Sequence, residues 1–446
     1  MGSSFGYDPE IVAEWHRRAT EDAAGASAFA RSLDDALKTQ LWRGPQSPIP
    51  IRPVILDQET AGRVAHAAKN VVQLAVAECE RRARDPYQLC DLLGVEPSPL
   101  LCGRPSWNQW AASQARPDLV LSGGVPKVLE CNIASAFGGP EHLHRMNARF
   151  WGDPRYRELA KKTRTWSGNS VSARRELVAR IAGQRTDGVP QIAVAGSNEQ
   201  HFVEVIDDAA SNGLPCVFVE LDELYEDGGL RNQHGLGIDV LLMKFVMEGA
   251  YADGEPMGAL EAAVEHDSTL LLAPALSHLY SNKKVLAWLT ERAPALPAHH
   301  RDFIEDHVPW TSVLEDRKVL RGGRERDLLG MLESHKEEFI VKPAGGLGGA
   351  GVVIGHETTD TEWRELLTDR LTGEYVVQEY CRPDTLPMSF VDEASGECLS
   401  LDLPHVLSPI LIEGRAGGIF ARFSAPGGPG VTSTAAGGLN TVFVHA

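Results

Sequence analysis

The spacing of hydrophobic and polar residues changes several times along the chain, and each change predicts a different kind of structure. Residues 8 to about 95 carry apolar side chains at helical spacing, as in the segment 61–78. Four prolines between 45 and 53 interrupt this pattern and predict an extended crossing between two helical regions. Helical spacing returns over 140–187 and over most of 280–335.

Shorter apolar runs predict strands elsewhere. Residues 116–132 are typical of a β-hairpin whose turn is formed by Gly123 and Gly124. Between about 190 and 275 strands alternate with helices, including a helix expected over 199–211. The strand candidates of this region are 191–195, 215–220, 239–245 and 269–273. Such alternation predicts an open, mostly parallel α/β sheet.

A glycine-rich loop between two short strands is the most informative segment, at residues 339–354. Lys342 ends the first strand, and the loop glycines are Gly345, Gly346, Gly348, Gly349 and Gly351. Glycine lets the backbone approach a ligand, successive N–H groups favour an anion, and the lysine supplies a point charge for a phosphate. A strand follows the loop, whereas P-loops and dinucleotide folds need a helix there. The segment predicts a flap over a nucleotide; a glycine loop without a ligand is the alternative.

Oxygen ligands converge on the predicted hairpin. Glu130 and Asn132 are two residues apart on one strand and share a face, and Asp118 lies near the start of the opposing strand. Two carboxylates and an amide oxygen form a site suited to Mg²⁺. A solvated polar face of the hairpin is the alternative. Ser135 and two glycines at 138 and 139 follow directly and allow close backbone approach.

Three further segments carry candidate binding residues. Lys283 and Lys284 fall in the first turn of a predicted helix, where cations are unfavourable, so an anion such as a phosphate is expected beside them. Residues 378–380 end a buried strand and can present backbone amides and a carboxylate to an adenine and a ribose. Arg422 ends a strand before a glycine-rich stretch and can bind a carboxylate or an acyl phosphate bidentately. A solvated lysine pair and a surface arginine are the alternatives.

Composition narrows the class of protein. The 446 residues include 43 basic and 61 acidic side chains, a net charge of −18 that argues against nucleic acid or an anionic membrane as a partner. No apolar stretch is long enough to span a membrane, and the first ten residues lack the pattern of a secretory signal. The seven cysteines are dispersed and include no Cys-x-x-Cys pair. We therefore expect a reduced cytoplasmic protein without a cysteine zinc site.

In their order, these segments resemble the ATP-grasp carboxylate–amine ligases, which cover their nucleotide with a glycine-rich flap between two strands. The chain looks most like the circularly permuted kind, eukaryotic-type glutathione synthetase and glutathionylspermidine synthetase, in which Glu-x-Asn precedes the glycine loop. Here Glu130-Cys-Asn132 precedes Lys342. The stretches 130–139 and 282–285 and the tail from 418 to 438 are also similar. The glycine loop lacks the charged Arg-Glu of glutathione synthetase, and the tail lacks the lysine that follows the arginine there.

The resemblance implies a circularly permuted ATP-grasp fold of the α/β class. The spacing of apolar residues predicts a helical N-terminal region (1–100), and the resemblance implies that 101–189, with the metal-binding hairpin, is part of the core. It further implies an inserted, open, mostly parallel substrate domain (190–278) and a nucleotide-binding domain with the flap (279–446). The first hundred residues show no motif of these families.

The resemblance also implies a reaction: ATP-dependent joining of a carboxylate to an amine through an acyl phosphate, with Mg²⁺. The implied substrates are amino acids or a small peptide, and a γ-glutamyl donor is one candidate for the acid. A homodimer is implied as well. The implied roles are Mg²⁺ binding by Asp118, Glu130 and Asn132; phosphate binding by Lys283, Lys342 and the flap glycines; adenine binding by Gln378, Glu379 and Tyr380; and substrate or acyl-phosphate binding by Arg116, Ser135 and Arg422.

Two other functions remain open from the sequence. A non-catalytic nucleotide-binding or regulatory protein would bind ATP without releasing ADP. A kinase-like phosphotransferase would release ADP without free phosphate. The set of metal-binding oxygens favours an active enzyme over the first of these, and only the resemblance argues against the second.

Overall fold

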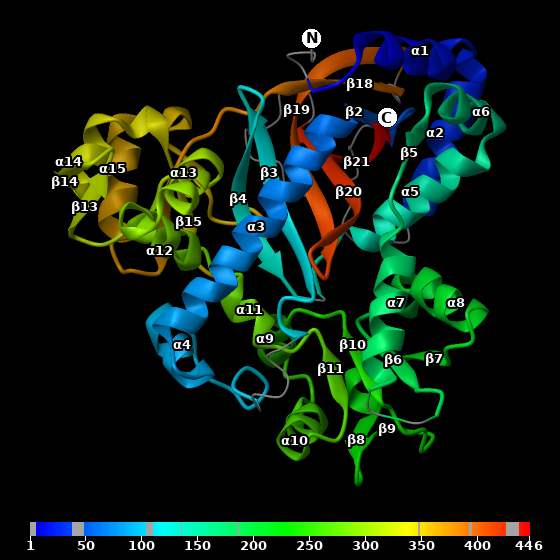
Figure 1. The fold of residues 1–446 in the computed structure, drawn as a ribbon, viewed down its shortest axis with the longest axis horizontal. Helices are drawn as coiled ribbons and strands as arrows, with labels where there is room; N and C mark the ends of the chain where they lie inside the picture. Colours follow the sequence, from blue (N-terminus) through cyan, green and yellow to red (C-terminus); the bar gives the residue numbers. More distant parts are fainter. Residues whose placement is uncertain are drawn as a thin grey trace.

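A computed structural model of the chain describes residues 6–37, 49–103, 110–134, 136–184, 186, 188–346, 348–391, 395–424 and 437–446. Within these residues the strands form a nine-stranded sheet, two four-stranded sheets and two small hairpins. We call the first the large sheet; the other two are the parallel sheet and the small sheet. The large sheet lies in the middle of the molecule, between the small sheet on one side and the parallel sheet below it (Figure 1).

The large sheet combines strands from both ends of the chain. Its path runs β1 (Ile49–Pro50), β18 (Thr385–Val391), β19 (Cys398–Ile412), β20 (Arg415–Ser424), β21 (Gly437–His445) and β2 (Val54–Asp57). The hairpin of β3 (Gln114–Ser122) and β4 (Val125–Ile133) joins at β19, and β5 (Thr165–Trp166) joins at β21. Gly123 and Gly124 form the hairpin turn with φ of 59° and 77°, which confirms the predicted hairpin.

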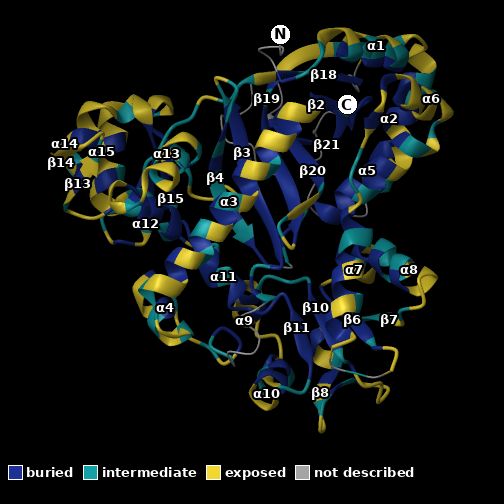
Figure 2. Ribbon diagram, viewed as in Figure 1, coloured by how far each residue is buried: buried dark blue, intermediate teal, exposed yellow. Residues whose placement is uncertain are grey.

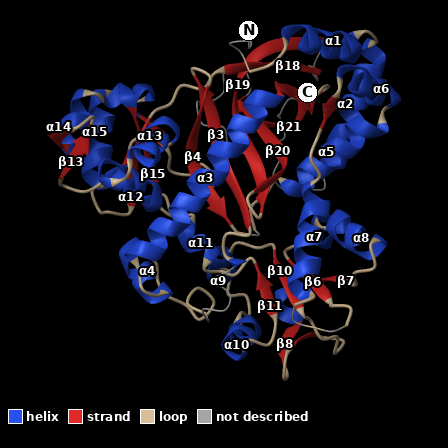
Figure 3. Cartoon of the chain, viewed as in Figure 1, coloured by secondary structure: helices blue, strands red, loops and turns tan. Residues whose placement is uncertain are grey.

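Helices from the first half of the chain cover this sheet (Figure 3). They are α1 (Pro9–Thr20), α2 (Ala23–Leu37), α3 (Gln58–Arg82), α5 (Pro140–Gly152), α6 (Pro154–Thr163) and α7 (Ser170–Ala182). The short helix α4 (Pro86–Leu93) follows α3 but lies away from this sheet and contacts α11 (Ser277–Tyr280). The predicted helical spacing is confirmed. The helical spacing did not predict β2, because its three consecutive apolar residues, Val54 to Leu56, are too few to show a period; β2 is held by parallel pairing with β21.

The parallel sheet confirms the predicted α/β region. Its order is β11 (Leu270–Leu272), β10 (Val240–Met243), β6 (Ile192–Ala195) and β7 (Cys216–Val219), and all its pairings are parallel. The central strands β6 and β10 are buried along their whole length, as expected for strands covered on both faces. The predicted helix over 199–211 begins as a 3₁₀ turn and continues as α8 (Val203–Ser211). The region also holds α9 (Met247–Ala252), α10 (Gly258–His266) and the hairpin of β8 (Leu224–Glu226) and β9 (Leu230–Asn232).

The small sheet is antiparallel and carries the glycine loop. Its order is β12 (Thr311–Val313), β17 (Tyr375–Glu379), β15 (Phe339–Pro343) and β16 (Val353–Ile354). The helices of this part are α11 (Ser277–Tyr280), α12 (Lys284–Arg292), α13 (Ala298–His307), α14 (Leu328–Ser334) and α15 (Asp360–Asp369). The expectation of helix over most of 280–335 was wrong for β12 and for the hairpin of β13 (Lys318–Arg321) and β14 (Arg324–Asp327). These strands have three or four residues each, and β14 is wholly exposed, so their sequences carry little periodic signal.

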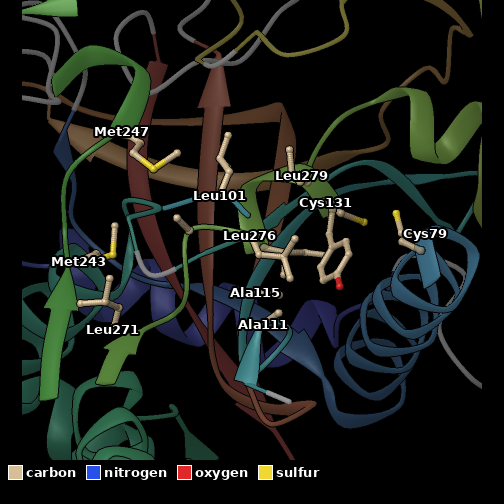
Figure 4. Packing of buried hydrophobic residues seen from close by; sticks show 14 of the residues in the cluster. Cys79, Leu101, Ala111, Ala115, Cys131, Met243, Met247, Leu271, Leu276 and Leu279 are labelled. Atoms are coloured by element: carbon tan, nitrogen blue, oxygen red, sulfur yellow. The ribbon is translucent and has the colours of Figure 1, made fainter. Parts of the chain in front are cut away.

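A continuous apolar core fixes the parallel sheet against the hairpin of the large sheet (Figure 4). Met243 and Leu271 from the parallel sheet, Cys131 from β4 and Cys79 from α3 belong to one buried cluster. Figure 2 shows the buried interiors of the sheets beneath helices whose outer faces are exposed. Among the described residues, no helix combines the length and the apolar character needed to cross a membrane.

Candidate functional site

Side chains on the strands of the large sheet alternate between a buried core and an opposite face. On β3, Leu119 packs in the core beside α3, so Asp118 points the other way. On β20, Phe423 belongs to a core cluster with residues of β2 and β18, and Arg422 points to the opposite face. Alternation therefore brings Asp118 and Arg422, 304 positions apart in the sequence, to one face of one sheet.

A β-bulge adapts β4 to this arrangement. Asp118 pairs with Glu130 in the register of the hairpin, whereas Leu119 pairs with Val128. The extra residue is Leu129, which lines a cavity together with Glu130, while Val128 stays in the core. Bulges commonly re-aim side chains beside active sites. Here the bulge lets β4 present Glu130 without exposing the core residue Val128.

This face borders a cavity of about 230 Å³ between the large sheet and the small sheet. Its walls include most of the residues that the sequence singled out: Arg116, Asp118, Glu130, Asn132, Lys283, Lys342, Gly346, Gly348, Gly349, Gln378, Glu379, Tyr380 and Arg422. Gly345 lies outside the lining. Ser135, and residues 425–436 of the glycine-rich tail, lie outside the described residues. The structure thus brings the predicted residues together; their individual roles stay predictions.

A buried carboxylate between two arginines forms one end of the cavity. Arg116 contacts both carboxylate oxygens of Asp118 at 3.3 Å, and Nη2 of Arg422 lies 2.5 Å from Oδ2 of Asp118. Ser408 Oγ donates a hydrogen bond of 2.7 Å to Oδ1. Burial alone would raise the pKa of Asp118, but the two guanidinium groups outweigh it and hold that pKa well below its usual range. Asp118 is therefore a permanent anion that fixes both arginines.

Glu130 and Asn132 lie beside this cluster. The Asn132 amide donates to Oε1 of Glu130 at 3.3 Å and to Oδ2 of Asp118 at 3.4 Å. Rotating this amide by half a turn would give up its hydrogen bond of 3.1 Å to the Arg116 carbonyl and present its oxygen beside the two carboxylates, a set of oxygens that suits a cation such as Mg²⁺. In the described part of the chain no group of three or more His, Cys, Asp and Glu residues is arranged to hold a metal. A cation here would depend on Asn132 as well as on the carboxylates.

Two lysines enter the cavity from the opposite side, next to the small sheet. Lys283 immediately precedes α12, and its Nζ donates to the carbonyl of Gly346 at 2.6 Å and lies 3.4 Å from Oε2 of Glu130. Lys342 is buried on β15 and donates to Oε1 of Gln378 at 2.6 Å. Burial lowers the pKa of Lys342 to about 8. Lys284 points elsewhere, to the carbonyl of Leu93 at 2.8 Å, so only the first lysine of the predicted pair faces the site.

The glycine loop covers the cavity from the small sheet. Gly348, Gly349 and Gly351 have φ of 65°, 79° and 70°, in the left-handed region that favours glycine. The predicted hairpin of β15 and β16 is confirmed by antiparallel pairing of Ile340 with Ile354. The loop therefore lies over the cavity in a conformation that depends on glycine.

Residues 378–380 line the cavity, but their polar groups are arranged differently from the expectation. The backbone N–H groups of Glu379 and Tyr380 donate to the carbonyls of Trp310 and Glu338 at 2.8 and 2.7 Å. The Glu379 carboxylate pairs with Arg321 at 3.0 Å. The expectation that these two amides face a base was wrong, because antiparallel neighbours and adjoining loops of the small sheet already occupy them.

Several lining residues escaped sequence reasoning. They are His142, Val246, His278 and Ser281. The Phe-Gly-Gly segment gave a signal, since Arg116 Nη1 donates to the Gly138 carbonyl at 2.6 Å and Gly139 has φ of 114°. His142 gave none, because one histidine on an amphipathic helix looks the same whether it faces solvent or a cavity.

Comparison with known proteins supports the fold. No protein-family model and no curated protein matches the chain. A solved glutathione synthetase-like effector from Globodera pallida, in its apo form, covers 98% of each chain at 12% identity with a TM-score of 0.58. A γ-glutamylcysteine synthetase candidate from Methylobacillus flagellatus covers 86% of each chain at 12% identity with a TM-score of 0.42. D-alanyl-alanine synthetase A from Vibrio cholerae covers 57% of this chain and 88% of its own at 11% identity, with a TM-score of 0.27.

Only the first likeness is close enough to carry an argument, and at 12% identity it concerns the fold alone. The chain has the mixed α/β fold of a glutathione synthetase-like protein over nearly its whole length. At the level of the fold, this structural likeness agrees with the sequence motifs, which resemble those of ATP-grasp ligases.

Proposed function

We propose that the protein is an ATP-dependent carboxylate–amine ligase with a circularly permuted ATP-grasp arrangement, in which the parallel sheet is an inserted substrate domain. The observation that carries the proposal is the single cavity in which a glycine flap and two lysines face a carboxylate–amide set and two arginines. The substrates are amino acids or a small peptide, and the product is an amide bond with ADP and phosphate.

The charge of the cavity supports a polyphosphate ligand. Its described lining contains four cationic side chains, Arg116, Lys283, Lys342 and Arg422, and three carboxylates, Asp118, Glu130 and Glu379. Glu379 is paired with Arg321, which is outside the lining, so the cavity itself has an excess of positive charge. This is the reverse of the whole chain, whose net charge is −18. An anionic nucleotide therefore has a favourable local field within an acidic protein.

The proposed roles follow from the geometry. Lys283 and Lys342 would exchange their present acceptors, a backbone carbonyl and a glutamine oxygen, for phosphate oxygens of ATP. Arg116 and Arg422 would orient the carboxylate and stabilise the acyl phosphate that it forms by attack on the γ-phosphorus. The flap would exclude water until the amine displaces phosphate from this intermediate. The task of the protein is positioning and charge neutralisation.

Mg²⁺ fits the oxygen set of Glu130, Asn132 and Asp118. When bound there it would neutralise phosphate charge and act as a Lewis acid. Glu130 suits this role because its side chain is 27% exposed, whereas that of Asp118 is 4% exposed and is already held by both arginines.

The test of the reaction is ADP and phosphate release from the purified protein with Mg-ATP and pairs of amino acids, including glutamate, with products identified by mass spectrometry. Phosphate release that requires both an acid and an amine, together with a condensation product, supports the ligase. ADP without free phosphate would instead identify a phosphotransferase. Nucleotide binding without turnover on any pair would favour a binding protein.

Replacement of Glu130 tests the metal assignment. Glu130→Ala should reduce Mg²⁺-dependent turnover by about a thousandfold or more, because the remaining ligands leave the phosphate charge poorly neutralised. The folded state should persist, since Glu130 is partly exposed and the buried Lys283 keeps its hydrogen bond to the Gly346 carbonyl. Glu374→Ala, an exposed acid next to β17, is the matched control and should keep full activity. Full activity of Glu130→Ala would refute the metal role.

A further inference from the structure

Two cysteine sulfurs lie in contact at the end of α4. Sγ of Cys90, in the last turn of the helix, is 3.9 Å from Sγ of Cys102, in the segment that follows the helix. Both are free thiols. The sulfur atoms of a disulfide are about 2.05 Å apart, so a shift of about 2 Å brings these two to bonding distance. Groups that are held in contact react with one another far faster than groups that must first meet.

The two thiols differ in their access to solvent. Cys90 is 1% exposed and belongs to the buried core cluster, whereas Cys102 is partly exposed and packs against the edge of that cluster. A small molecule in solution therefore reaches Cys102 and not Cys90. A reaction that begins at Cys102 can then pass to Cys90 through the sulfur contact.

The other five cysteines lack this combination of access and contact. Cys79 and Cys131 belong to the same core (Figure 4), but they are 0% and 4% exposed and are shielded from a dissolved oxidant. The remaining three are partly exposed, but within the described part of the chain none of them has a hydrogen-bonding contact with a second sulfur. Only at the end of α4 does a thiol that solvent reaches touch another thiol.

The contact between the sulfurs also fixes which one is the nucleophile. Burial raises the pKa of both thiols, and it raises that of Cys90 to about 12. For Cys102 the hydrogen bond from the Cys90 thiol partly opposes the effect of burial, because it stabilises a thiolate at Cys102. Cys102 therefore loses its proton more readily than Cys90.

The pair lies between two parts of the molecule. On one side, Lys284 Nζ of α12 donates a hydrogen bond of 2.8 Å to the carbonyl of Leu93, the last residue of α4. On the other side, Gly103 packs so closely on α10 that an added Cβ would lie 2.2 Å from Cγ1 of Val264. A bond between the two sulfurs would therefore tie α12, through α4, to α10 in the region of the parallel sheet.

We propose that Cys90 and Cys102 are a modification site, at which a small uncharged organic disulfide oxidises the two thiols to a reversible disulfide. The Cys102 thiolate attacks one sulfur of the oxidant and displaces its first thiol. Cys90 then gives up its proton and attacks the Cys102 sulfur of this mixed disulfide, which displaces the second thiol. The two cysteines lose two electrons and two protons in total, and the two released thiols carry them away. The inference goes beyond the proposed ligase function and does not depend on it.

Mass spectrometry of the folded full chain after treatment with bis(2-hydroxyethyl) disulfide tests the site. Asp91 is the only aspartate between the two cysteines, so cleavage before aspartate places them on separate fragments, 85–90 and 91–117. These fragments should be joined in the treated protein and separate again after reduction with dithiothreitol. The rate of joining should rise about tenfold per pH unit between pH 7 and 9, because burial keeps Cys102 protonated in this range.

Single replacements separate the two steps. Cys90→Ala should stop at the mixed disulfide, so that fragment 91–117 carries one mercaptoethanol unit. Cys102→Ser should leave Cys90 unmodified, because the oxidant does not reach a buried thiol. Cys398→Ser, at a partly exposed cysteine without a sulfur neighbour, is the matched control and should keep the joined fragments. The proposal is overturned if the folded native protein yields no joined fragments, if they form only in urea, or if Cys90 is modified equally fast in Cys102→Ser.

Discussion

The two sides of the cavity hold their charges in different ways. On the large sheet, Asp118 is surrounded by Arg116, Arg422 and Ser408, and charges are neutralised by opposite charges. On the side of the small sheet, Lys342 is hydrogen-bonded to a glutamine oxygen, and Lys283 combines a backbone carbonyl at 2.6 Å with the more distant Glu130. The first side pairs its charges with one another, although Nε of Arg422 has no hydrogen-bond partner among the described residues, whereas the second side holds its cations mainly on neutral acceptors.

This difference indicates a division of labour. A cation held by a neutral acceptor can exchange it for a phosphate oxygen without leaving a carboxylate behind, so the small sheet and its flap are suited to binding and releasing a nucleotide. The arginines of the large sheet are already aligned by Asp118 and need little rearrangement to meet a developing negative charge. We therefore expect mutations in the arginine cluster of the large sheet mainly to lower stability. Mutations of the lysines and the flap beside the small sheet should mainly weaken ligand binding.

The largest effect on stability is expected at Asp118. Asp118→Asn would leave two buried guanidinium groups without their carboxylate, and loss of one partner from a buried ion pair costs about 3–5 kcal/mol. Urea titration should therefore show a large fall in the free energy of unfolding. Glu130→Gln, on the paired position of β4, should cost about 1 kcal/mol, because the Glu130 side chain is 27% exposed and the buried Lys283 keeps its hydrogen bond to the Gly346 carbonyl. Equal losses in the two variants would show that Asp118 between its two arginines is held no more tightly than the neighbouring carboxylate of the same hairpin.

Much of this arrangement was predictable because local periodicity and tertiary structure agree. The hairpin around Gly123-Gly124, the parallel sheet and the β15–β16 pair follow from short-range patterns, and the structure confirms them. Glu130 and Asn132 could be placed on one face from their spacing of two. Their meeting with Lys342 and Arg422 could not be derived from spacing and was expected only from the resemblance.

Other features depend on contacts that a sequence does not encode locally. The bulge at Leu129 arises from the mismatch between two strands, and nothing in either strand alone marks it. The partners of Glu379 and Tyr380 come from residues about forty to seventy positions away in the chain. His142 is recognisable as a lining residue only when the cavity is known.

The second-largest effect concerns pH and Lys342. Burial lowers its pKa to about 8, below the usual 10.5 of the unfolded chain. Between about pH 8 and 10.5 the unfolded state binds more protons, so the free energy of unfolding should rise with pH by up to about 1.4 kcal/mol per unit. Lys342→Met should lose this part of the slope. The measurement is urea unfolding at several pH values for both proteins.

A bound nucleotide makes the same test more specific. Other groups titrate in this pH range, but the native protein and Lys342→Met share them. Their contributions therefore cancel when the free energies of unfolding of the two proteins are subtracted. Saturation with Mg²⁺ and a non-hydrolysable ATP analogue should raise the pKa of Lys342 and flatten the slope in the native protein alone. If the analogue changes both proteins equally, Lys342 does not contact the phosphates.

The smallest expected effect separates flap geometry from flap composition. Gly348 and Gly345 both have open space around the position of an added Cβ, but only Gly348 has a positive φ, at 65°. Gly348→Ala should therefore strain the flap by about 1 kcal/mol, while Gly345→Ala should not. Because this strain lies in a surface loop, it should appear as a fall of about fivefold in affinity for the ATP analogue, with thermal unfolding almost unchanged. Titration of both variants with the analogue would measure the difference, and equal affinities would show that the left-handed turn of the flap contributes nothing to nucleotide binding.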